Sequence, residues 1–172
     1  MACSASSAFQ SKDDRASVKN NEDATVLMIQ VFDLREELRA NPERVRLTQA
    51  LTLNPDRPQM GLRGTCGLFG SSEWWESIES GRMPLRKISG KIERVYYAGQ
   101  GGSGPNNMVD VLADDGVRDS VGIYVNDPKG VDLFQVGRSV EILYALDELK
   151  QQPASDGSVN YSRVALKMFV SN

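Results

Sequence analysis

The sequence predicts a mainly β protein of the α+β class, in which a five-stranded small barrel follows an N-terminal helical extension. Two observations support this fold class. From residue 85 onward, apolar and polar residues alternate in five separate segments, as in strands with one buried face. Before residue 85, apolar residues follow helical spacing or are interrupted by proline and glycine. With 172 residues, of which 40% are hydrophobic, the chain can bury a real core.

Four segments follow from this pattern. Residues 1–24 are rich in Ser, Ala, Asn and Asp and offer little apolar surface, so we expect a disordered tail. Residues 25–60 form the helical extension, and residues 61–84 form a connection that contains a short helix with both tryptophans. Residues 85–172 form the small β-barrel.

The first half of the extension fits two interpretations. Apolar residues recur there at helical spacing, at Leu27, Val31, Leu34 and Leu38. The β-branched beginning fits a strand equally well, and in that case Asp33 and Glu36 form a capping box that opens a shorter helix. Asn41-Pro42 ends the element in both interpretations, because proline disfavours helical geometry in the residue before it.

Residues 43–53 are also ambiguous. Their apolar residues alternate as in a strand, whereas Asn41 as N-cap and Pro42 as first helical residue suit a helix. In the connection that follows, Ser72 is expected to cap a helix over residues 73–79.

The two adjacent tryptophans cannot point the same way on this short helix. We therefore expect one of Trp74 and Trp75 to be buried and the other to be more exposed. An exposed tryptophan beside Glu73 and Glu76 would suit a protein-binding hot spot. The favoured interpretation is that the helix packs against one end of the barrel through a tryptophan and Ile78.

The strands of the barrel are predicted over residues 88–96, 109–113, 121–125, 140–146 and 164–170. Asp114-Asp115-Gly116 is typical of a hairpin turn between the second and third strands. One helical turn around Leu133 and Phe134 is expected between the third and fourth strands.

This order of elements resembles an OB-fold, with an SH3-like barrel as the alternative. In an OB-fold, the glycine-rich loop over residues 99–105 would join the first two strands and would commonly contact ligands. The segments GLFGSSEWWESIESG and ISGKIERVYYAG also resemble small bacterial proteins of unassigned function, a likeness that implies no activity.

The composition excludes several chemistries. The sequence contains no histidine, which excludes a histidine general base, a Ser-His triad and a histidine-ligated metal. Cys3 and Cys66 are too few for a disulfide framework or a zinc site, and we expect Cys66 to be inert. Asp110, Asp114 and Asp115 are better explained by turn chemistry than by a calcium or magnesium site. We therefore predict no metal, no cofactor and no catalytic residue.

Charge and hydropathy bear on nucleic-acid binding and on the location of the protein. A net charge of −3 and a pI near 5.1 argue against a general nucleic-acid binder. The first residues lack the apolar centre of a secretory signal, and the longest apolar run is too short to span a membrane. We therefore expect a soluble, cytoplasmic protein.

A basic segment beside aromatic residues supplies the candidate binding site. Basic groups neutralise phosphates and aromatic rings stack on bases, which is what single-stranded nucleic acid requires. The alternative is a solvated strand face with cross-strand ion pairs to acids such as Asp110 and Asp119; Arg94 would lie on the opposite face unless a bulge intervenes. The candidate binding residues, for protein or nucleic acid, are Trp74, Trp75, Arg86, Lys87, Lys91, Arg94, Tyr96 and Tyr97.

These observations predict a non-enzymatic binding module whose partner is another protein, such as an accessory or neutralising protein. Single-stranded nucleic-acid binding is the first alternative, although the acidic pI disfavours it. A hydrolase that uses carboxylates and needs no histidine is the second. Exposed strand edges would also permit a homodimer.

Overall fold

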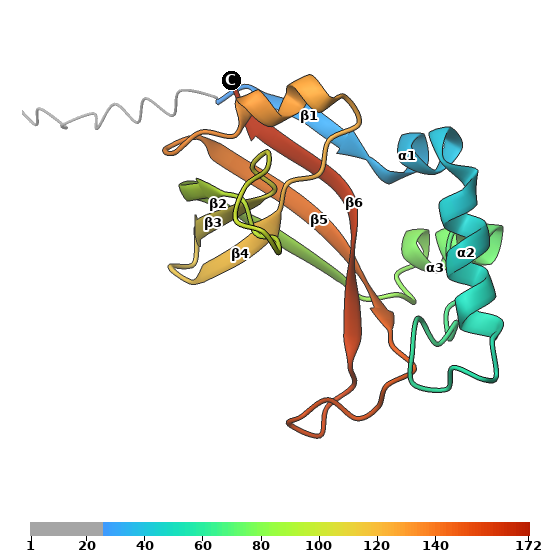
Figure 1. Ribbon diagram of the computed structural model, residues 1–172. Coiled ribbons are helices and arrows are strands. Elements are labelled where there is room, and N and C mark those ends of the chain that lie inside the picture. Colours follow the sequence, from blue (N-terminus) through green and yellow to red (C-terminus); the bar gives the residue numbers. More distant parts are fainter. Residues whose placement is uncertain (1–25) are drawn as a thin grey trace, which may run out of the picture.

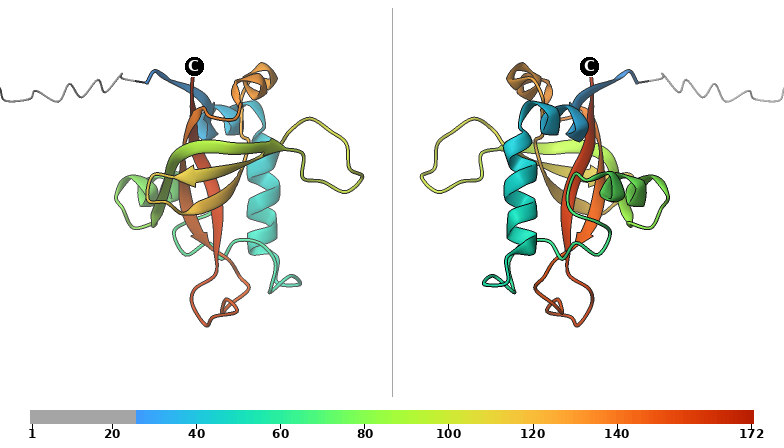
Figure 2. Two further views of the ribbon diagram at one scale, coloured as in Figure 1. Left: turned by 90° about the vertical axis from the view of Figure 1, so that its left-hand side faces the viewer. Right: turned by 90° about the vertical axis from the view of Figure 1, so that its right-hand side faces the viewer.

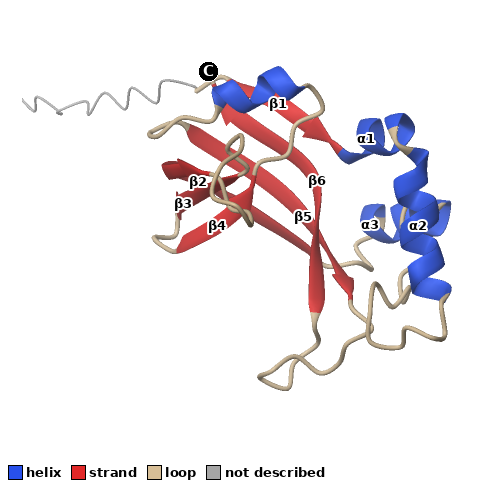
Figure 3. Ribbon diagram, viewed as in Figure 1, coloured by secondary structure: helices blue, strands red, loops and turns tan. Residues whose placement is uncertain are grey.

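The computed structural model describes residues 26–172 as a six-stranded sheet with three helices gathered on one side of it (Figures 1 and 3). The strands are β1 (Met28–Asp33), β2 (Leu85–Tyr96), β3 (Met108–Ala113), β4 (Arg118–Gly122), β5 (Ser139–Glu148) and β6 (Tyr161–Ser171). The helices are α1 (Leu34–Ala40), α2 (Pro42–Leu53), α3 (Ser72–Glu79) and the 3-10 helix η1 (Pro128–Leu133). The predicted mainly β class is confirmed. The disordered tail predicted over residues 1–24 lies outside the described residues.

The sheet has the strand order β1-β6-β5-β2-β3-β4, and every neighbouring pair is antiparallel. Its two outermost strands, β1 and β4, do not pair with each other, so the sheet is not closed. The two ends are linked by Asn126, in the loop after β4: its backbone N–H donates to the carbonyl of Val31 at 2.9 Å. The OB-like and SH3-like barrel types therefore stay predictions.

The strand β1 is a sixth strand, one more than the sequence predicts. The extension expected over residues 25–60 is helical only from Leu34 onward, because residues 28–33 pair with β6 and bury Phe32. The interpretation with a strand followed by a shorter helix is thus confirmed, but the capping box with Glu36 was wrong, because the backbone N–H of Asp33 donates instead to Oδ1 of Asn126 at 2.7 Å. The side chain of Asp33 accepts a hydrogen bond from the backbone N–H of Arg35 at 2.8 Å and caps α1.

Residues 43–53 are helical and belong to α2, which begins at Pro42. The helix has no fully buried residue, since its apolar side chains are spread over two sides; Leu47 and Leu53 are exposed. Its C-terminal end is held by Lys150, whose Nζ donates to the carbonyls of Leu51 at 2.7 Å and Asn54 at 3.2 Å.

Several predicted boundaries differ from the structure, and two of these differences have a clear physical cause. The N-cap of α3 is Ser71 rather than Ser72, because the hydroxyl of Ser71 accepts from the backbone N–H of Trp74 at 3.2 Å. The third predicted strand, over 121–125, is β4 at 118–122. It ends earlier because Asn126 already turns toward β1.

Most of the hydrophobic core is contributed by alternating residues of the strands, joined by side chains from the helices and loops. The fully buried strand residues include Val109, Val111, Ile142, Met168 and Val170. On the helical side, Leu34 and Trp74 are completely buried, so α1 and α3 are packed against the sheet and are not separate units.

Candidate functional site

Most of the basic residues predicted as a binding site on β2 face acidic residues of other strands. The shortest nitrogen–oxygen distance is 2.7 Å in each of three ion pairs: Arg86 with Asp119, Lys87 with Glu141, and Arg94 with Asp110. Lys91 instead donates to the hydroxyl of Ser139 at 3.3 Å. The predicted cross-strand ion pairs are therefore present, and they compensate the positive charge of β2 locally.

A bulge in β2 decides which way Arg94 points. The register with β3 shifts between Ile92 and Arg94, which brings Arg94 opposite Asp110. The guanidinium of Arg94 also lies over the ring of Tyr96, 4.1 Å from its centroid. The hydroxyl of Ser120, followed by Arg94 and Tyr96, holds the pKa of Asp110 below its usual range. The oxygens of Asp110 are thus already bonded within the protein.

The glycine-rich loop after β2 folds around Tyr97. A Cβ added to Gly99 would lie 2.2 Å from the hydroxyl oxygen of Tyr97, and one added to Gly104 would lie 2.5 Å from its ring. These two glycines therefore allow the loop to pack closely on the tyrosine, which is half-buried. Figure 2 shows this loop projecting from the sheet.

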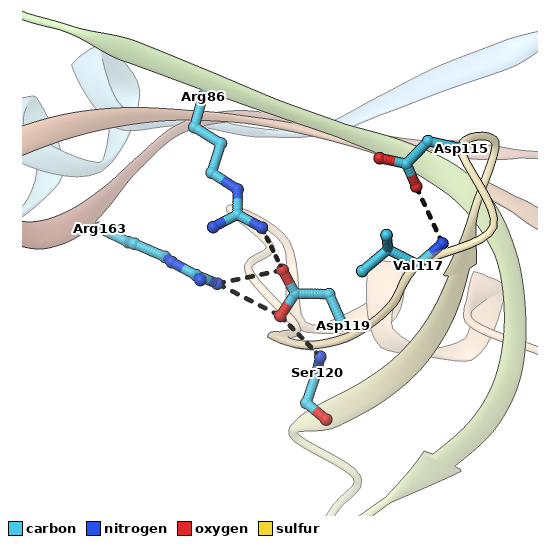
Figure 4. A network of polar contacts seen from close by, with 6 residues as sticks. All are labelled: Arg86, Asp115, Val117, Asp119, Ser120 and Arg163. Carbon is cyan, nitrogen blue, oxygen red and sulfur yellow. Dashed lines mark hydrogen bonds and ion pairs between the residues drawn. The ribbon is translucent and has the colours of Figure 1, made fainter. Parts of the chain in front are cut away.

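Asp119 on β4 joins three strands in one polar network (Figure 4). Its carboxylate accepts from Arg86 on β2 at 2.7 Å and from Arg163 on β6, with both oxygens 3.3 Å from Nη1. The backbone N–H of Ser120 donates to the same carboxylate at 3.0 Å. Two guanidinium groups thus share one carboxylate beside a cavity of about 310 Å³. Arg163 was absent from the residues predicted from sequence.

The two tryptophans of α3 differ in exposure, as predicted. Trp74 is completely buried, and its indole N–H donates to Oδ2 of Asp147 on β5 at 2.8 Å. Trp75 is only partly buried and meets Trp74 edge-on, with ring centroids 4.8 Å apart. Burial raises the pKa of Asp147, although the hydrogen bond from Trp74 opposes this shift. The sequence pattern gave no sign that Asp147 is the buried partner of Trp74.

Residues of α1, α2, α3 and the loop before α3 line a cavity of about 390 Å³, here called the helical groove. It is lined by Arg35, Leu38, Arg39, Val45, Gly70 and Trp75. The guanidinium of Arg35 lies over the ring of Trp75, 3.9 Å from its centroid, and pairs with Glu79 at 2.7 Å. Only Trp75 of this set was predicted, since about forty residues of chain separate it from Arg35.

Cys66 is not activated as a nucleophile. Burial, and after it the nearby charge of Asp147, raises the pKa of its thiol, so the thiol is protonated near neutral pH. Within residues 26–172, no three cysteine, aspartate or glutamate side chains are gathered as metal ligands. Over the same range, no helix has the length and hydropathy needed to cross a membrane.

A known protein family matches nearly the whole described part of the chain. The model of a family described as immunity protein RhsI2 matches residues 28–171, from the first residue of β1 to the last residue of β6. No curated protein matches the chain. The predicted binding roles of Trp74 and Trp75, and of the basic and aromatic residues of β2, stay predictions.

Proposed function

Since this chain belongs to the RhsI2 immunity protein family, we propose that it neutralises one cognate toxin by forming a direct, stoichiometric protein complex with it. Proteins of immunity families generally act by binding a toxin rather than by catalysis, which agrees with the neutralising protein predicted from the sequence. The observation that carries the proposal is the extent of the match, because it covers the whole described sheet and all its helices.

The nucleic-acid alternative gains no support from β2. Arg86, Lys87 and Arg94 are each paired with a carboxylate, so phosphate binding would first have to break these ion pairs.

The hydrolase alternative is not supported by the buried carboxylate. Asp147 combines a raised pKa with burial, as a general acid does, but it is 2% exposed and is bonded to Trp74 inside the core. A substrate cannot reach it there.

Co-expression tests the proposal. Cells that produce the toxin should grow when the full chain is produced with it, and should not be protected from an unrelated toxin by the same chain. The purified proteins should form a one-to-one complex by calorimetry and light scattering, and the complex should survive nuclease treatment. Protection without a complex, or a complex lost after nuclease treatment, would contradict the proposal.

A further inference from the structure

We propose that the helical groove receives the toxin, and that the toxin fills it with an apolar side chain flanked by a carboxylate. This inference rests on the function proposed above. The lining of the groove comes from α1, α2, α3 and the loop before α3, and these three helices lie together on one side of the sheet (Figures 1 and 3). The groove volume of about 390 Å³ lies within the usual range of ligand pockets, about 300–1,000 Å³.

The floor of the groove is apolar. Leu38 of α1 and Val45 of α2 meet there, and the loop before α3 contributes Gly70. A Cβ added to Gly70 would lie 3.2 Å from Val45 and 3.4 Å from Leu38. Glycine therefore lets the loop backbone lie directly against the floor, and an apolar side chain of the toxin would bury these two aliphatic residues further.

One wall is an arginine–tryptophan pair. Trp75 is only partly buried, and Arg35 lies over its ring while held on its other side by Glu79. Tryptophan and arginine are enriched among the residues that carry most of the binding energy of protein interfaces. Because Trp75 rests edge-on against the buried Trp74, this wall is already fixed before a partner arrives.

The charge of the residues that line the groove indicates which polar group of the toxin would bind there. The two charged residues that line the groove, Arg35 and Arg39, are both positive. Glu79 compensates Arg35, but among the described residues Arg39 makes no ion pair. Glu36, its near neighbour on α1, makes no ion pair with it and lines a different cavity, together with Phe32 and Asn126. A carboxylate from the toxin would supply the counter-ion that Arg39 lacks.

The chain offers a matched control on β4. Arg118 resembles Arg35 because its guanidinium also pairs with a carboxylate, that of Glu93, at 2.8 Å. It lies on the sheet, outside the groove, and is not among the predicted binding residues. Charge reversal at Arg35 and at Arg118 therefore breaks an equivalent ion pair, and only the first should alter the groove.

The experiment measures affinity of the full chain for the toxin with four proteins: wild type, Arg39→Glu, Arg35→Glu and Arg118→Glu. We expect both groove variants to bind the toxin about 30-fold or more weakly, as loss of a hot-spot residue does, and Arg118→Glu to bind within a few-fold of wild type. Circular dichroism and thermal unfolding establish that each variant is folded. Arg39→Glu is the decisive variant, because Arg39 is exposed and its loss breaks no ion pair among the described residues, only a hydrogen bond from its Nε to the carbonyl of Arg35 at 3.2 Å.

The possible results separate the two proposals. Equal affinity of all four proteins for the toxin would contradict the proposal that the toxin binds in the groove, but not the proposal that the chain neutralises the toxin. Failure of the wild-type chain to bind would overturn both. If light scattering showed a wild-type dimer that the groove variants lose, with toxin affinity unchanged, the groove would be a contact between two copies and the inference would be wrong.

Discussion

At the scale of single residues, the contact between Trp74 and Asp147 is the most demanding in the core. A carboxylate is completely enclosed, and the indole N–H of Trp74 is its one side-chain partner, at 2.8 Å. Removal of a charge from water is costly, which is why burial raises the pKa of Asp147. The contact thus fixes α3 on β5 and makes stability depend on pH.

The direction of this dependence follows from the raised pKa. The folded state holds the proton of Asp147 more tightly than the unfolded state does, so its contribution to stability falls as pH rises from the ordinary carboxyl range through the raised pKa. Asparagine does not ionise and its amide oxygen still accepts from Trp74. We expect Asp147→Asn to gain in unfolding free energy relative to wild type as pH rises through this window. Urea unfolding at a series of pH values measures it, and identical pH profiles for the two proteins would contradict it.

The sequence predicted half of this contact. Adjacent helix positions diverge, so one buried and one exposed tryptophan were expected. The partner of the buried ring was not, since Asp147 is 73 residues away along the chain. Likewise Arg35, Arg39 and Val45 meet Trp75 only in the folded protein, and no local spacing relates residues on separate helices.

At the scale of elements, period-2 alternation identified β2, β3, β5 and β6 because each buries one face in the core. It could not decide between strand and helix for β1. Leu27, Val31, Leu34 and Leu38 satisfy helical spacing, and only pairing with β6 makes Met28–Asp33 extended. In α2 the same ambiguity has another cause, because the helix has no single buried face.

The C-terminal end of α2 should depend on Lys150. Its ammonium group donates to three carbonyls at this end, those of Leu51, Asn54 and Arg57, and carries the charge that a helix C-terminus favours. We expect Lys150→Met to lower the free energy of unfolding by about 1–2 kcal/mol and to speed amide hydrogen exchange in the last turn of α2. Lys167→Met, on the exposed side of β6, is the control and should change neither.

The close approach of the β2 and β3 backbones should depend on Gly90. A Cβ at this position would lie 2.2 Å from the carbonyl oxygen of Leu112, and backbone cannot move aside as a side chain can. We expect Gly90→Ala to lower stability by about 3 kcal/mol or more, measured by chemical denaturation. Gly116→Ala separates steric overlap from backbone strain, because Gly116 has a φ of +84° and open space around it. It should cost only about 1 kcal/mol.

At the scale of the whole molecule, Asn126 joins the two ends of the open sheet. Its Oδ1 accepts from the backbone N–H of Asp33 at 2.7 Å, and its Nδ2 donates to the carbonyl of Asp33 at 3.2 Å. Together with the backbone hydrogen bond from Asn126 to Val31, these bonds join Asn126, in the loop after β4, to the backbone of β1, as a neighbouring strand would be joined.

Loss of this side chain should loosen β1 selectively. We expect Asn126→Ala to destabilise the protein by about 1–2 kcal/mol and to speed amide exchange across Met28–Asp33. Asn107→Ala is a matched control, because the amide of Asn107 makes the same two bonds to the backbone of Ala98 within a single loop. Its effect should stay in that loop, and faster exchange of β1 in both variants would show that the link at Asn126 is not specific.

The pairing of β1 with β6 also orders events during folding. Met28 pairs with Ser171, at opposite ends of the described chain, so closing this contact carries a large loss of chain entropy. The strands β5 and β6 are consecutive in the chain, and contacts between distant segments form slowly, so we expect β6 to pair with β5 before β1 joins it. Because α1 continues directly from β1, Arg35 and Arg39 reach their final positions only with this last strand. An incompletely folded chain would therefore present the sheet before it presents the groove, and the capacity to bind the toxin would arise late, together with the finished fold.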